Sequence, residues 1–202
     1  MVKDRKEIII EATLDLAAEY GLRAVTLNMI AEKVGIKKPS LYNHFQSKEQ
    51  LVDEAYLYLR EKAKKKTGVA LPDYDVLFGS KTACEVLCSL VDGYSKMTAE
   101  EEIFKFYKVV YYERCYSPIA AKILAEETEK MIAATKQIFY AMEVRKLLHF
   151  NNPDSSAVEF AFVVHGLLDY ARDKAAFEEK GVLMPKKLLN EYIIDFCKEH
   201  AV

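Results

Sequence analysis

The side chains best suited to chemistry lie close together, between residues 37 and 48 of the 202-residue chain. They include cations, hydroxyls, an amide and an imidazole, and no acid: Lys37, Lys38, Ser40, Tyr42, Asn43, His44 and Lys48. Such groups bind phosphate oxygens and the hydrogen-bonding edges of bases in the DNA major groove. Lys48 stands in the first turn of a predicted helix, where acids are usual, and this favours an anionic partner. The pattern predicts a DNA-binding surface.

Two short predicted helices position these side chains. Thr26 can cap the first, which ends before Gly35, and Pro39 stands where the second begins, in "KPSLYNHF". Leu41 and Phe45 are expected to pin the second helix to its neighbours, and Leu41 is also counted among the DNA-contacting residues. Two helices joined by a short turn with a glycine are typical of a helix-turn-helix. Exposed polar residues on a helical hairpin are also ordinary surface, and this plainer interpretation stays open.

The rest of the chain is predicted to be helical as well. It holds seven glycines and five prolines, and no alternating strand pattern bounded by hairpin turns. Apolar residues recur at helical spacing up to Gly21, and Ser47 and Gln50 stand in capping-box relation at the start of a helix that continues the apolar stripe to Leu59. Further helices are predicted near residues 81–97, 100–114, 118–147, 155–179 and 186–200. The fold class is therefore all-α.

A segment rich in Gly, Pro and Asp, residues 67–80, is expected to connect two domains. The first, residues 1–66, carries 13 Lys and Arg against 10 Asp and Glu, a net charge of +3. Since the whole chain carries −2, residues 67–202 carry −5. A basic first domain beside an acidic second domain suits an anionic partner that binds the first domain alone.

The stretch "TLNMIAEKVGIKKPSLYNHFQSKEQL", preceded by a helix pattern ending in "EYG", closely resembles the amino-terminal DNA-binding domain of TetR-family (tetracycline-repressor-like) transcriptional regulators. The similarity covers roughly residues 5 to 60. It implies that most DNA contacts come from Thr26, Lys38, Ser40, Tyr42, His44 and Lys48. Lys37 stands where the family often has a capping Ser or Thr, and Pro39 replaces a frequent glycine.

The resemblance also implies a larger helical second domain that dimerises through its last two helices and binds a small effector. The expected protein is a ligand-responsive repressor that binds a palindromic operator as a homodimer. The alternatives are a helix-turn-helix dimer that senses no small molecule, and an activator. From the residues alone, the candidate effector contacts are Tyr107 and Tyr111, within a tyrosine-rich stretch, and His165 with Asp169, one helical turn apart.

An enzyme that merely contains a helical hairpin is the remaining rival. No nucleophile motif or glycine-rich elbow accompanies His165 and Asp169, so no catalytic residue is expected. Cys84 and Cys88 share a helix face and are interpreted as small apolar residues, and the four cysteines lack zinc-site spacing. We therefore expect no metal and no cofactor beyond the unknown effector. No apolar run is long enough to span a membrane, and the expected location is the cytoplasm.

Overall fold

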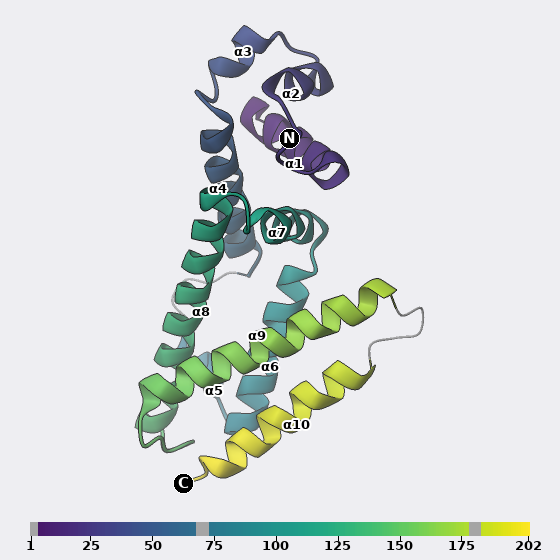
Figure 1. The fold of residues 1–202 in the computed structure, drawn as a ribbon. Helices are drawn as coiled ribbons and strands as arrows, with labels where there is room; N and C mark the ends of the chain where they lie inside the picture. Colours follow the sequence, from purple (N-terminus) through teal and green to yellow (C-terminus); the bar gives the residue numbers. More distant parts are fainter. Residues whose placement is uncertain (1–3, 68–72, 178–182) are drawn as a thin grey trace. The chain divides into compact units, whose positions relative to one another are not determined.

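The computed structural model describes residues 4–67, 73–177 and 183–202, and every regular element within them is a helix. The helices, in chain order, are α1 (Arg5–Tyr20), α2 (Leu27–Val34), α3 (Lys38–Tyr42), α4 (Lys48–Thr67), α5 (Tyr74–Phe78), α6 (Ala83–Thr98), α7 (Glu101–Glu113), α8 (Pro118–Val144), α9 (Pro153–Phe177) and α10 (Leu183–Glu199). Figure 1 labels these helices along the chain. The predicted all-α class is confirmed.

Hydrogen bonds within a few residues determine where the first helices begin and end. The α1 helix stops at Gly21, whose φ of 79° lies in the region that favours glycine and whose N–H donates to the carbonyl of Ala17 at 2.9 Å. Thr26 caps α2, because its hydroxyl accepts a hydrogen bond from the N–H of Met29 at 3.3 Å. Ser47 caps α4 by accepting from the N–H of Gln50 at 3.1 Å. These boundaries agree with those expected from the sequence.

The chain folds into two compact units. The first unit comprises residues 1–70 and 97–127, so α7 and the start of α8 belong with the amino-terminal helices. Within it α1 packs against α2, α4 and α7, and α2 packs against α3. One buried core joins these helices and takes side chains from both segments of the chain, among them Ile9, Ile30, Leu41, Phe45, Leu51, Phe106 and Val110.

The second unit comprises residues 71–96 and 128–202. In it α9 and α10 lie side by side and antiparallel (Figure 1). Its core is rich in aromatic rings, and the ring of Phe139 stacks on that of Phe150 with centroids 4.5 Å apart. Phe196 of α10 packs against both Phe139 and Phe160, which ties α10 to α8 and α9.

The structure differs from the sequence-based expectations in three places. Residues 67–80, expected to be only a connection, contain α5, which Asp73 caps by accepting from the N–H groups of Asp75 and Val76. The helix that begins near Pro39 ends at Tyr42, short of the predicted Phe45. Residues 97–127, assigned to the second domain by the expected boundary at residue 66, pack in the first unit.

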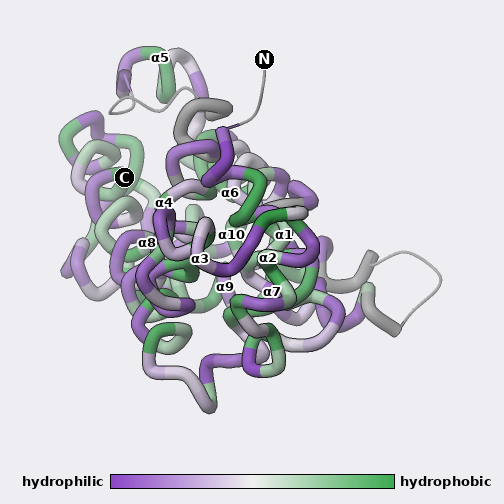
Figure 2. Tube along the Cα trace, turned by 90° about the horizontal axis from the view of Figure 1, so that it is seen from above, coloured by the Kyte–Doolittle hydropathy of each residue, from purple (hydrophilic) through white to green (hydrophobic). Residues whose placement is uncertain are grey.

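Hydrophobic and hydrophilic residues alternate along the helices, as Figure 2 shows. This alternation is typical of helices that bury one side only. Among the described residues, no helix has the length and the apolar character needed to cross a membrane.

Candidate nucleic-acid interface

The turn between α2 and α3 is set by Gly35. Its φ of 72° and ψ of 35° place it in the left-handed region, and its N–H donates to the carbonyl of Glu32. The N–H of Ile36 then donates to the carbonyl of Ala31 at 2.9 Å, which closes the end of α2. A Cβ at residue 35 would meet no atom within 4 Å, so the backbone conformation alone favours glycine here.

The α3 helix exposes a polar surface made of its cations, hydroxyls and amide. Lys37, Lys38, Ser40, Tyr42 and Asn43 are all exposed, and His44 is half-buried. Tyr42 keeps 45% of its surface exposed, and the Nζ of Lys38 lies 5.9 Å from the centre of its ring. Five of the six side chains predicted to point outward here are therefore exposed, and His44 is the exception. Whether they contact DNA stays a prediction.

The predicted DNA contact of Leu41 is not consistent with its position in the structure. Its side chain is fully buried, with 0% of its surface exposed, and it belongs to the core of the first unit together with Phe45. An α-helix presents opposite faces to core and solvent, and Leu41 occupies the core face of α3. Leu41 therefore anchors the helix and does not reach a base or a phosphate.

The start of α3 lacks a side-chain cap. Lys37 occupies the N-cap position with extended backbone, and its side chain accepts no hydrogen bond from the helix. Pro39 follows in the first turn, where its missing N–H costs little. A helix of five residues without a cap has little stability of its own, so α3 depends on Leu41 and the core for its position.

Lys48 is held partly inward at the start of α4. Its Nζ donates to the carbonyl of Arg23, in the turn between α1 and α2, at 3.5 Å. Burial lowers the pKa of Lys48, and the nearby acids Glu113 and Glu49 oppose this change. The ammonium can therefore serve the structure and still offer further donors to an anion outside.

A buried acid from α7 reaches the same turn. Glu113, the last residue of α7, keeps only 5% of its surface exposed. Its Oε1 accepts a hydrogen bond from the backbone N–H of Arg23 at 3.3 Å. Arg23 and Glu113 are 90 positions apart in the chain, so no local sequence pattern predicts their hydrogen bond. For this reason Glu113 cannot be recognised from the sequence alone.

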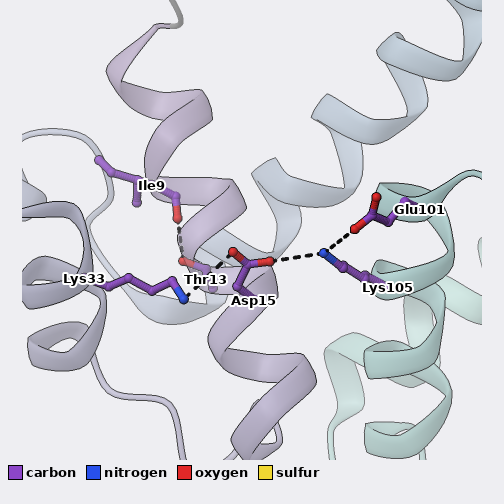
Figure 3. Close-up of polar contacts among 6 residues, drawn as sticks. All are labelled: Ile9, Thr13, Asp15, Lys33, Glu101 and Lys105. Carbon is purple, nitrogen blue, oxygen red and sulfur yellow. Dashed lines mark hydrogen bonds and ion pairs between the residues drawn. The ribbon is translucent and has the colours of Figure 1, made fainter.

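A second polar connection runs from α2 through α1 to α7. Figure 3 shows Asp15 of α1 between Lys33 of α2 and Lys105 of α7. The carboxylate of Asp15 lies 3.9 Å from the Nζ of Lys33 and 3.5 Å from the Nζ of Lys105, which also pairs with Glu101 at 2.9 Å. All four side chains are substantially exposed, so each pair contributes only a few tenths of a kcal/mol to about 1 kcal/mol.

The predicted effector contacts divide between the two units. Tyr107 and Tyr111 lie one turn apart on α7, in the first unit. The hydroxyl of Tyr107 donates to Glu127 Oε2 at 2.8 Å, and that of Tyr56 donates to Glu127 Oε1. The guanidinium of Arg114 stands 5.2 Å from the ring centre of Tyr111. The Tyr107 hydroxyl therefore has a partner within the protein.

His165 and Asp169 lie on α9 in the second unit. The Nε2 of His165 is 3.5 Å from Asp169 Oδ2, and the Nη1 of Arg172 is 2.5 Å from Asp169 Oδ1. Asp169 is thus shared by a histidine and an arginine on its own helix. The role of this pair in effector binding stays a prediction.

The cysteines are free thiols. Cys84, Cys88 and Cys197 pack, partly buried, against the core of the second unit, and Cys115 is exposed. Burial raises the pKa of Cys88 to about 11 and that of Cys197 to about 12, so these thiols stay protonated at neutral pH. Within residues 4–67, 73–177 and 183–202, no group of three or more His, Cys, Asp and Glu side chains could hold a metal ion.

Comparison with known proteins agrees with this geometry. Residues 9–55 match the family model described as bacterial regulatory proteins, tetR family. The chain is 32% identical over 68 residues to the HTH-type transcriptional regulator YhgD of Bacillus subtilis, covering 34% of this chain and 36% of YhgD. It is 47% identical over 53 residues to the transcriptional repressor KstR2 of Mycobacterium tuberculosis, covering 26% of each chain. The matched region thus spans only about a quarter to a third of these relatives.

The fold is shared over a longer stretch. A Mesorhizobium loti protein assigned to the TetR family of transcriptional regulators superposes with a TM-score of 0.72, covering 99% of this chain and 100% of its own, at 20% sequence identity. At this identity the likeness concerns the fold alone. Residues 9–55 therefore match the family of tetR bacterial regulatory proteins, and the chain as a whole shares its fold with the Mesorhizobium loti protein.

Proposed function

We propose that this protein binds double-stranded DNA as a homodimer and represses transcription from a palindromic operator. The observation that carries the proposal is the exposed side of α3, where Lys37, Lys38, Ser40, Tyr42 and Asn43 face solvent and Leu41 faces the core. Basic and hydroxyl side chains on a short exposed helix suit the major groove. The relatives matched over this region are transcriptional regulators, and KstR2 is a repressor.

Two subunits are needed for useful specificity. One short helix touches few bases, whereas a dimer doubles the contacts and requires two half-sites separated by about one helical turn, roughly 34 Å. The second unit offers a surface for pairing, since Phe162 and Tyr170 on α9 keep 52% and 41% of their surfaces exposed. They are eight residues apart, close to the same face of the helix. This supports dimerisation through α9 and α10.

Fluorescence anisotropy with a labelled duplex from upstream of the protein's own gene tests DNA binding. The homodimer should bind with an affinity that falls steeply as salt rises. Tyr42→Ala should weaken binding about tenfold, whereas the matched control Tyr112→Ala, at a tyrosine 73% exposed on α7, should not. Equal binding by wild type and Tyr42→Ala would remove the recognition role from α3.

The effector is the finer part of the proposal. Tyr107, Tyr111, His165 and Asp169 are its candidate contacts, and the polar partners of Tyr107 and Asp169 show that both lie among hydrogen-bonding groups. A compound that binds the DNA-free protein but not the DNA-bound protein must lower the affinity for the operator. A thermal-shift screen followed by anisotropy with each hit measures this coupling.

Two alternatives give different results in the same experiments. If the protein senses no small molecule, compounds that raise its melting temperature leave operator affinity unchanged. If it is an activator, deleting its gene lowers the transcript of the neighbouring gene, whereas deleting a repressor raises it.

A further inference from the structure

Glu113 stands out because a buried carboxylate needs a reason to be retained. Removing a charged group from water costs several kcal/mol unless polar partners replace the water. Glu113 lies at the end of α7, nearly fully buried, and its Oε1 accepts from the N–H of Arg23 at 3.3 Å. The same oxygen is 3.8 Å from the position that a Cβ on Gly21 would take. The acid is therefore inserted against the turn that joins α1 to α2.

Two side chains form hydrogen bonds with the backbone of Arg23. Its N–H donates to Glu113, and its carbonyl accepts from the Nζ of Lys48 at 3.5 Å. The charges of Glu113 and Lys48 also attract each other, which opposes the lowering of the pKa of Lys48 by burial. One turn of backbone is thus fixed between an acid of α7 and a base of α4.

This turn lies between two residues predicted to bind phosphate. Thr26 follows Arg23 by three residues and caps α2, where free N–H groups and a hydroxyl meet. Lys48 stands at the start of α4, and its Nζ donates to the carbonyl of Arg23 in this turn. Any movement of Arg23 therefore shifts both groups relative to a DNA backbone.

We propose that Glu113 is a positioning residue for DNA binding, which fixes the turn between α1 and α2 and so sets Thr26 and Lys48 against the phosphates. This inference rests on the DNA-binding function proposed above. The proposal predicts that removing Glu113 changes DNA affinity in the opposite direction to that expected from charge repulsion. Removing an acid near bound DNA normally strengthens binding by reducing repulsion, whereas removing this acid weakens it.

A double-mutant cycle with the full-length protein tests the proposal, using anisotropy with the duplex that the wild type binds. Glu113→Ala should raise the Kd about tenfold in the wild-type background and about threefold in the Lys48→Ala background, where only the effect through Thr26 remains. Glu113→Gln keeps an oxygen that can accept from Arg23 but loses the charge, and should raise the Kd only about threefold. Glu101→Ala makes the same change in charge at an exposed site of α7 and should bind as tightly as wild type or slightly more tightly.

Several outcomes would overturn the inference. Unchanged or tighter binding by Glu113→Ala would show that the acid positions nothing, and a tenfold loss persisting in Lys48→Ala would show that it does not act through Lys48. If circular dichroism shows that Glu113→Ala is unfolded, Glu113→Gln is the variant that tests the proposal. Unchanged or tighter DNA binding by Glu113→Gln would refute the positioning role. If the wild type binds no duplex, the proposed function fails instead.

Discussion

Leu41 and Tyr42 are neighbours in α3, and substituting each with alanine should damage different properties. Leu41 is completely buried, while Tyr42 keeps almost half of its surface exposed. If the first anchors the helix and the second meets DNA, Leu41→Ala should reduce the free energy of unfolding and Tyr42→Ala should reduce DNA affinity.

The size of the Leu41 effect follows from its burial. Replacing a fully buried leucine by alanine costs about 2–5 kcal/mol, since the transfer energy of the lost carbons adds to the energy of the cavity. We expect about 3 kcal/mol, which lowers the Tm of a chain of this size by about 6–12 °C. The loss should be local at first, because α3 has five residues and no side-chain cap.

Urea unfolding followed by circular dichroism at 222 nm measures the stability of both variants, and anisotropy at low temperature measures their DNA affinity. Tyr42→Ala should unfold within about 0.5 kcal/mol of wild type. Leu57→Ala is the matched control for Leu41→Ala, because Leu57 lies on α4 with 58% of its surface exposed and should cost little.

Two results would refute the reasoning. Wild-type stability in Leu41→Ala would mean that the core does not hold α3 through this residue. A loss of DNA affinity at unchanged stability would mean that Leu41 contacts DNA after all.

Three further predictions concern other parts of the molecule. Lys38→Ala should make the negative slope of log binding constant against log salt concentration shallower by about 1.8, because each subunit loses one phosphate contact worth about 0.9. An unchanged slope, measured by anisotropy, would exclude these contacts. Phe162→Glu should yield monomers in sedimentation velocity if α9 forms the dimer surface, and a persistent dimer would refute this. Tyr192→Phe should raise stability at pH 7 by about 1 kcal/mol, because the buried hydroxyl has no hydrogen-bond partner among the described residues. Burial raises the folded-state pKa of Tyr192 from 10.0 to about 12, so wild-type stability should fall between pH 10 and 12, and urea titration should show a smaller fall in the variant.

Local chemistry made most of the helices predictable. Thr26 caps α2, Ser47 caps α4 and Gly35 adopts a left-handed conformation, and each role depends only on residues within a few positions. The apolar spacing of α1 and α2 likewise indicates which face is buried, because a helix repeats every 3.6 residues. These features require no knowledge of the rest of the fold.

Contacts between distant segments could not be predicted in this way. The hydrogen bond from Arg23 to Glu113 joins residues 90 positions apart, and the three-way contact of Glu127 with Tyr56 and Tyr107 likewise depends on the tertiary fold. The helix α5 was missed because Gly, Pro and Asp suggested a loop, although Asp73 caps it and Phe78 buries its end. Leu41 was assigned two incompatible roles, and only its burial decides between them.

The assembly of the first unit from two separate stretches of chain limits how this protein can be divided. A fragment that ends at residue 66 keeps the helix-turn-helix but lacks α7, which contributes Phe106, Val109 and Val110 to the shared core. The apolar side chains that face α7 would then meet water, and the free fragment would be prone to aggregate. The helix-turn-helix segment of this protein is therefore not an independent folding unit, and transferring it to another protein requires a substitute for α7.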